Sequence, residues 1–182
     1  MRNFIYILFF LPVFTFGQEE KTHLQQGNAH YAKGEFEEAE NKYKKALEIN
    51  PEYEKAEFNL GDALYQQKKY ADASEQYNKV ISSTDNDELK ASSYHNLGNA
   101  MAESEKYEEA VEAYKNSLRI NPSDQDTRQN LSMTRKMLQQ QKEKEQKKDE
   151  NKDSKEDNKD ENKKDDKSDK KDANSTNFVT YQ

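Results

Sequence analysis

Apolar residues recur at helical spacing along most of the chain, and the pattern itself repeats. The stretch FEEAENKYKKALEINP at residues 36–51 returns as YEEAVEAYKNSLRINP at 107–122, and in a weaker copy as YADASEQYNKVISSTD at 70–85. The copies begin 34 and then 37 residues apart. A period in this range indicates a stack of similar supersecondary units, none of which can bury its apolar face alone.

Alignment on Gly27, Gly61 and Gly98 defines three units, residues 20–53, 54–87 and 91–124, with residues 88–90 inserted between the second and third. Each unit has two apolar stripes separated by a short polar turn, which predicts two antiparallel helices. The first turn contains Gly34, which is free to take a positive φ. Asn-Pro at 50–51 and at 121–122 ends the second helix, because proline lacks an amide hydrogen and restricts its predecessor. The expected fold class is all-α.

The same residue types occupy the same positions in all three units. The first helix carries a glycine, and the second carries an aromatic residue, an alanine and a tyrosine, namely Phe36, Ala39 and Tyr43; Tyr70, Ala73 and Tyr77; and Tyr107, Ala110 and Tyr114. Small residues allow close helix approach, and aromatic residues fill the space between neighbouring hairpins. This arrangement resembles the tetratricopeptide repeat (TPR), a 34-residue helix–turn–helix unit. The resemblance implies three TPR repeats, spanning residues 18–124, in a right-handed superhelical stack.

The N-terminus has the layout of a Sec-type signal peptide over residues 1–17. Arg2 precedes an apolar run at residues 4–14, and the small residues Thr15 and Gly17 precede a cleavage point before Gln18. The run is short for a helix that must cross about 30 Å of hydrocarbon. An uncleaved membrane anchor is the alternative. The mature protein is expected in the periplasm, with membrane association through its partners.

The C-terminal third divides into a capping helix and a charged tail. Residues 125–148 carry a narrow apolar stripe with Leu131 and Leu138, and Asp124 or Ser123 is suited to cap the start of the helix. Residues 149–182 are rich in Lys, Asp, Glu and Asn, and this composition predicts disorder. The tail is then a solvated spacer, or its end at residues 178–181 adds a strand to a partner.

The composition excludes several classes of function. The 182 residues are 31% hydrophobic and 36% charged, and a net charge of −7 argues against a nucleic-acid partner. There is no cysteine, and His23, His30 and His95 are not at metal-ligand spacing. Neither a phosphate-binding glycine loop nor a serine elbow is present. The sequence predicts no enzyme, no metal, no cofactor and no small-molecule substrate.

The TPR resemblance places function on the concave face, which is lined by the first helices and binds protein partners. The residues at its groove positions are Leu24, Asn28, Tyr31, Phe58, Asp62, Tyr65, His95 and Asn99, to which the capping helix adds Gln129 and Met133. The alternative is that Tyr31 and Tyr65 only pack on the next helix, and that His95 is structural.

One well-known TPR ligand is not expected. TPR co-chaperones hold a C-terminal carboxylate with a Lys-Asn-Asn-Lys-Arg clamp, whose positions here are Leu24, Asn28, Asn59, Ser92 and Asn96. Both asparagines of the clamp are kept and all three cations are missing, so an acidic peptide would lose its charge-assisted hydrogen bonds.

Signal peptide, three repeats and a charged tail together resemble the BatC-type TPR component of the bacterial aerotolerance (Bat) operon. That resemblance implies an exported adaptor in oxidative or envelope stress, which assists membrane proteins with von Willebrand A domains. The alternative is a periplasmic chaperone-like factor of envelope biogenesis with several clients. An adaptor should show one stoichiometric partner, whereas a chaperone-like factor should show many.

Overall fold

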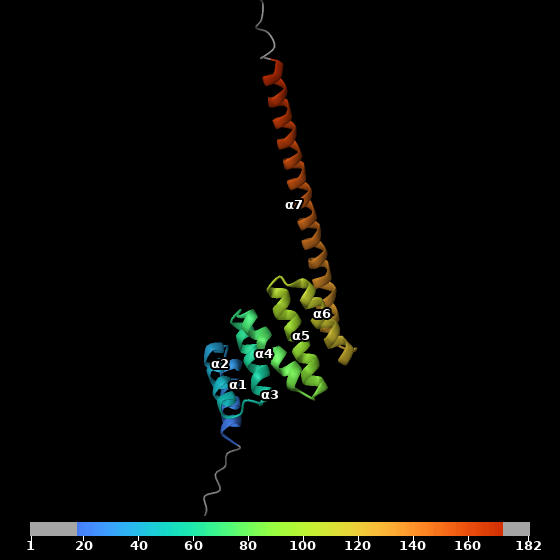
Figure 1. Ribbon diagram of the computed structural model, residues 1–182. Helices are drawn as coiled ribbons and strands as arrows, with labels where there is room; N and C mark the ends of the chain where they lie inside the picture. The colour runs from blue at the N-terminus through green and yellow to red at the C-terminus, as the bar shows by residue number, and fades with distance from the viewer. Residues whose placement is uncertain (1–17, 173–182) are drawn as a thin grey trace, which may run out of the picture. The chain divides into compact units, whose positions relative to one another are not determined.

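The computed structural model describes the backbone of residues 18–172, and side chains up to residue 148. Over this range the protein is all-helical, which confirms the predicted fold class (Figure 1). The helices are α1 (Glu19–Ala32), α2 (Phe36–Ile49), α3 (Glu54–Gln66), α4 (Tyr70–Ser83), α5 (Asp87–Glu103), α6 (Tyr107–Ile120) and α7 (Gln125–Asp172). Of the described residues, 18–134 belong to one compact unit and 135–172 to a second.

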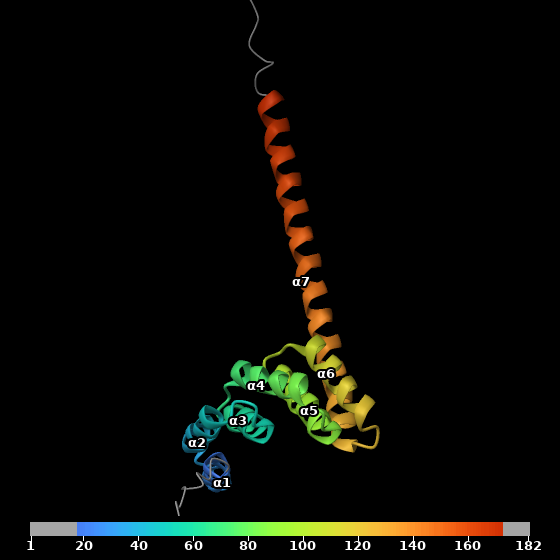
Figure 2. The same cartoon turned by 60° about the horizontal axis from the view of Figure 1, so that its bottom comes forward.

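The first six helices form three hairpins, α1–α2, α3–α4 and α5–α6, as the repeat pattern predicts. Consecutive hairpins stack through α2 against α3 and α4 against α5 (Figure 2). The first helices also contact one another, α1 with α3 and α3 with α5. The first helices therefore lie side by side and form a continuous face of the stack.

The turn inside each hairpin uses one residue in the left-handed region. Gly34 has φ 77°, as predicted, and the equivalent residues Lys68 and Glu105 have φ 61° and 59°. Each turn closes with the same backbone hydrogen bond, for example from Lys68 N to Tyr65 O at 2.8 Å. Only glycine takes this conformation without steric cost, so the backbone conformation of Lys68 and Glu105 is locally unfavourable.

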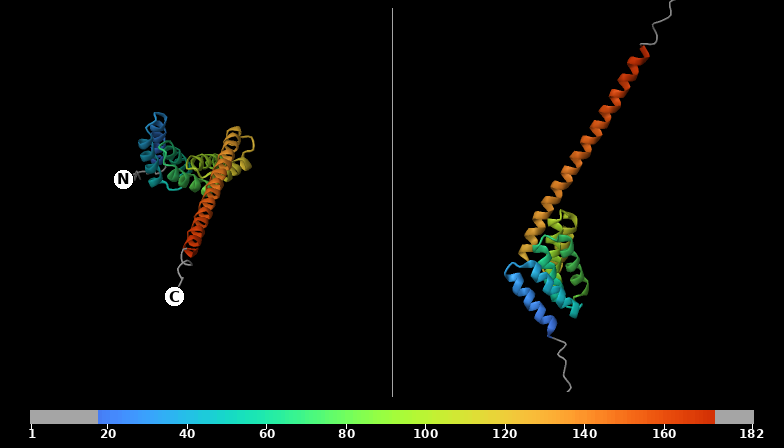
Figure 3. Two further views of the ribbon diagram at one scale, coloured as in Figure 1. Left: turned by 90° about the horizontal axis from the view of Figure 1, so that it is seen from above. Right: turned by 90° about the vertical axis from the view of Figure 1, so that its left-hand side faces the viewer.

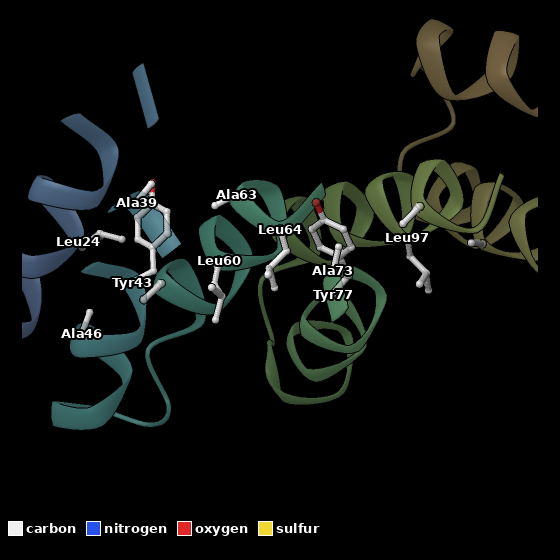
Figure 4. Packing of buried hydrophobic residues seen from close by; sticks show 13 residues of the cluster. Leu24, Ala39, Tyr43, Ala46, Leu60, Ala63, Leu64, Ala73, Tyr77 and Leu97 are labelled. Atoms are coloured by element: carbon white, nitrogen blue, oxygen red, sulfur yellow. The ribbon is translucent and has the colours of Figure 1, made fainter. Parts of the chain in front are cut away.

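The core of each hairpin is a tyrosine placed directly over a glycine. A Cβ atom built on Gly61 would lie 2.7 Å from Cε1 of Tyr77, and Gly27 and Gly98 have the same relation to Tyr43 and Tyr114. These three tyrosines are among the largest fully buried side chains. Figure 4 shows Tyr43 and Tyr77 among the buried leucines and alanines of neighbouring helices. Glycine is required here because any side chain would occupy the space of the ring.

Residues 88–90 do not form a separate connection between the second and third repeats. They belong to the first turn of α5, which at 17 residues is longer than α1 and α3. The helix starts at Asp87 because the side chain of Asn86 accepts a hydrogen bond from Leu89 N at 3.1 Å. Three residues add nearly one helical turn, so the insertion lengthens the helix and keeps its buried face in register.

α7 begins where the sequence predicts and ends later. Asp124 accepts a hydrogen bond from Thr127 N at 3.0 Å, so Asp124 caps the helix. The helix then continues to Asp172 (Figure 3), whereas the sequence predicts a helix that ends at residue 148 and disorder from residue 149. The charged composition indicates that this segment has no apolar core. A helix does not need one to form its backbone hydrogen bonds, because these lie within the helix itself. No glycine or proline interrupts the chain after Pro122.

Two predicted segments lie outside the described residues. They are the signal peptide at 1–17 and the chain end at 173–182, which contains the predicted docking segment Phe178–Tyr181.

Candidate protein-binding groove

Two adjoining hollows lie on the face formed by α1, α3 and α5. The larger has a volume of about 230 Å³ and is lined by Tyr31, Asp62, Tyr65, Gln66, Tyr77, Asn96 and Asn99. The smaller, of about 190 Å³, is lined by Asn28, Tyr31, Tyr43, Asn59 and Asp62. Because Tyr31 and Asp62 border both hollows, the two form one groove with these residues at its centre.

The floor of the groove is built from a repeated set of hydrogen bonds, which we call the polar ladder. In the first rung, Oδ1 of Asn28 accepts from the Tyr43 hydroxyl at 2.9 Å and from Nδ2 of Asn59 at 2.8 Å. The acceptor lies on the first helix of a repeat, the tyrosine on the second helix, and the donor asparagine on the next helix of the stack. Each rung therefore joins the two helices of one repeat to the following repeat.

The second and third rungs have the same geometry. Asp62 Oδ1 accepts from the Tyr77 hydroxyl at 2.7 Å and from Asn96 Nδ2 at 2.8 Å. Asn99 Oδ1 accepts from the Tyr114 hydroxyl at 2.7 Å and from Asn130 Nδ2 of α7 at 3.0 Å. The first part of α7 thus takes the place of a fourth first helix and completes the last rung.

Asp62 is the one acceptor of the ladder that carries a charge. Burial raises the pKa of this carboxyl to about 6, although the hydrogen bonds from Tyr77 and Asn96 lower it in part. The charge of Asp62 in turn acts on the neighbouring tyrosines. Burial raises the pKa of Tyr43 to about 12, and burial also raises the pKa of Tyr31 and of Tyr77, with the nearby charge of Asp62 as the next cause in each case. The centre of the groove is therefore a poorly hydrated carboxylate surrounded by phenol groups.

Tyr31 and Tyr65 are held in place as walls of the groove. Tyr31 packs edge-on against Phe36 with ring centroids 5.3 Å apart, and Tyr65 packs against Tyr70 at 5.4 Å. Both tyrosines are half-buried and line the larger hollow. Each ring therefore packs on a neighbour and also borders the hollow, and its use in binding stays a prediction.

Of the eight residues predicted at groove positions, five line the hollows: Asn28, Tyr31, Asp62, Tyr65 and Asn99. The other three have different surroundings. Leu24 is 9% exposed and belongs to the core, and Phe58 packs on Tyr77 with ring centroids 5.9 Å apart. Nδ1 of His95 lies within hydrogen-bonding distance of Oγ1 of the buried Thr127 in α7, so His95 joins the capping segment to the stack. None of these three side chains lines either hollow.

The donor asparagines of the ladder do not stand out in the sequence as groove residues. From the sequence, Asn59 and Asn96 are identified only as positions of a carboxylate clamp, and neither Asn130 nor Gln66 is predicted at the groove. The signal lies in the repeat register, since the three asparagines follow one another at intervals of 37 and 34 residues. Asparagine at one position of every unit, paired with a tyrosine on the other helix, indicates a structural hydrogen bond.

The described part of the chain offers neither a metal site nor a membrane span. Among the described residues, no group of three or more His, Cys, Asp or Glu side chains is arranged to hold a metal ion. No helix between residues 18 and 172 is both long and apolar enough to cross a membrane.

Solved structures share this fold. The first TPR domain of human RPAP3 is 21% identical and covers 69% of this chain and 97% of its own, with a TM-score of 0.64. The Sgt2 TPR domain from Aspergillus fumigatus is 21% identical and covers 69% of this chain and 82% of its own, with a TM-score of 0.63. The first TPR of Spaghetti (RPAP3), bound to the HSP90 peptide SRMEEVD, is 23% identical and covers 66% of this chain and 94% of its own, with a TM-score of 0.61.

No curated protein matches the chain. Two family profiles do: one described as a TPR repeat matches residues 27–68, and one described as a tetratricopeptide repeat matches residues 53–123. Together they span residues 27–123, more than half of the sequence, and the chain belongs to the tetratricopeptide repeat family.

Proposed function

We propose that this protein is an adaptor that binds a segment of a partner protein in the groove across α1, α3 and α5. The observation that carries the proposal is the pair of joined hollows, in which rigid tyrosine walls stand beside a row of polar groups. Aromatic anchors with a few fixed polar groups are typical of peptide-binding surfaces. Spaghetti (RPAP3) with its HSP90 peptide, and the second TPR domain of human RPAP3 with the HSP70 peptide SGPTIEEVD, are precedents for binding by this fold.

The ligand differs in chemistry from those two acidic peptides. Of the five clamp positions, Leu24 is buried, and Asn28, Asn59 and Asn96 belong to the polar ladder. None of the residues that line the hollows is a lysine or an arginine. A groove without cations, with a carboxylate at its centre, does not favour a peptide that ends in several negative charges.

The cellular location and the biological process are proposed from the sequence. The N-terminal pattern supports export, and the combination of segments supports a Bat-type role in oxidative or envelope stress. In that role the partner is a membrane protein with a von Willebrand A domain. The competing hypothesis is a periplasmic chaperone-like factor that handles several clients of envelope biogenesis.

The test compares a groove variant with a matched surface variant in the cells that make the protein. Gln66 is exposed and lines the larger hollow, and Asn78 is exposed on α4 of the same repeat and lines neither hollow. Full-length tagged wild type, Gln66→Trp and Asn78→Trp are crosslinked in cells and purified under stringent washing, and the copurifying proteins are quantified.

Binding through the groove predicts a partner that is lost with Gln66→Trp and kept with Asn78→Trp. A partner that persists equally with both variants contradicts binding in the groove. One dominant membrane protein with a von Willebrand A domain supports the Bat-type role, whereas many unrelated exported proteins support the chaperone-like role.

A further inference from the structure

The central carboxylate of the groove is not required by the polar ladder. Asn28 and Asn99 occupy the equivalent positions of the first and third repeats, and each accepts the same two hydrogen bonds through Oδ1. Asp62 also accepts both of its hydrogen bonds through Oδ1, and neither of them uses Oδ2. An asparagine would make this rung equally well, so these hydrogen bonds do not account for the charge.

The surroundings of Asp62 leave that charge uncompensated. The groups that border it in the two hollows are tyrosine hydroxyls and rings and the amides of Asn and Gln side chains. Burial raises the pKa of the carboxyl, so its charge is costly in this position. Buried charges in proteins are normally paired, and a ligand can provide the pair.

The hollow around Asp62 suits a long basic side chain. Its volume of about 230 Å³ far exceeds the roughly 30 Å³ that one water occupies. Tyr31 and Tyr65 border it, and aromatic rings attract cations and pack against the methylene groups of lysine and arginine. A cationic head beside Oδ2 would form a charge-assisted hydrogen bond.

We propose that the partner segment places a lysine or arginine side chain in the hollow between Tyr31 and Tyr65, where its cation pairs with Oδ2 of Asp62. This inference rests on the proposed function and adds the chemistry of the ligand to it. The partner motif is thus basic at one position, the opposite of the acidic peptides bound by the two RPAP3 structures.

The experiment selects ligands for the groove from random peptides, so the partner itself need not be identified first. Full-length protein is immobilised, and a displayed library of random nonapeptides is selected against wild type, Asp62→Asn and Asn99→Asp. Affinities of synthetic copies are then measured by fluorescence anisotropy. Asp62→Asn reproduces the side chain of the other two rungs and therefore keeps the ladder. Asn99→Asp places a second carboxylate one repeat further along the groove.

Wild type is expected to enrich lysine or arginine at one peptide position. Changing that residue to methionine should weaken binding by about tenfold or more, as expected for a lost hydrogen bond between charged groups. Asp62→Asn should bind both peptides equally, and Asn99→Asp should select a second basic position. A peptide of residues 142–172, which is rich in lysine, serves as a competitor.

The outcomes separate this inference from the proposed function. If no peptide is selected by any form of the protein, both fail. If peptides are selected without a basic preference, or if Asp62→Asn keeps that preference, groove binding stands and the role of Asp62 is refuted. If the peptide of residues 142–172 displaces the selected peptides at equal concentration, the occupant is the chain's own lysine-rich segment, and the proposed partner motif is refuted.

Discussion

Replacing Asp62 with asparagine should make the repeat stack more stable at neutral pH. The substitution keeps an oxygen in the place where Tyr77 and Asn96 donate, at 2.7 and 2.8 Å, and removes a negative charge from a poorly hydrated position. Residues in binding sites are often kept at a cost in stability, so a stabilising substitution at the centre of the groove is consistent with a role in binding.

The magnitude follows from the pKa. Burial raises the pKa of Asp62 from 3.8 to about 6, which corresponds to roughly 3 kcal/mol at 1.36 kcal/mol per pKa unit. Because the pKa is raised on folding, the stability linked to this group is greatest below pH 3.8 and is lost as the pH rises through about 6. The gain from Asp62→Asn should therefore be about 1–3 kcal/mol at pH 7.5 and below about 1 kcal/mol at pH 4.

The assay is urea unfolding followed by circular dichroism at the two pH values. Asp72→Asn in α4 is the control, because Asp72 is exposed in the same repeat, and its effect should stay within about 0.5 kcal/mol at both pH values. A variant no more stable than wild type at pH 7.5 would refute the reasoning. A gain of equal size at both pH values would also refute it, since the charge would then not be the cause.

Three further substitutions test the fold by the same unfolding measurement. Gly61→Ala puts a Cβ atom 2.7 Å from the Tyr77 ring and should cost about 1–3 kcal/mol, so an unchanged midpoint would disprove the close packing. Lys68→Gly removes the steric cost of a side chain at φ 61° and should raise the free energy of unfolding by about 1 kcal/mol. A lower free energy of unfolding would show that the lysine side chain contributes more than the backbone conformation costs. Burial raises the pKa of Glu40, but hydrogen bonds from Lys44, Lys69 and Gln67 outweigh it and lower the pKa to about 2. Because folding lowers this pKa, the Glu40 carboxylate stabilises the fold above its unfolded pKa of about 4.5, and this contribution is lost as the pH falls toward 2. Glu40→Gln should therefore lower the free energy of unfolding by about 1 kcal/mol at pH 7 and by little at pH 2. Equal losses at both pH values would count against the pairing of Glu40 with the two lysines.

The repeat pattern predicts the hairpins because each position has the same local task in every unit. Gly61 and Tyr77 are a clear case, since a glycine on one helix and a tyrosine on the other imply that the ring lies over the glycine. The groove is less predictable, because a groove position on a helix does not say whether a side chain faces solvent or its neighbours. Leu24, for example, is buried in the core, and Asn59 donates a hydrogen bond to Asn28 of the preceding repeat. The charged end of α7 shows the limit of composition, which measures the lack of a core and not the tendency to form a helix.

Photo-crosslinking from inside the groove is the most direct test of partner binding. A benzoylphenylalanine residue replaces Gln66 in one full-length variant and Asn78 in another, and both are irradiated in the cells that make the protein. If a partner segment occupies the groove, the position of Gln66 gives one strong adduct that is absent from the position of Asn78. An adduct of equal strength from Asn78, or from Asn78 alone, would show that the partner binds elsewhere on the stack.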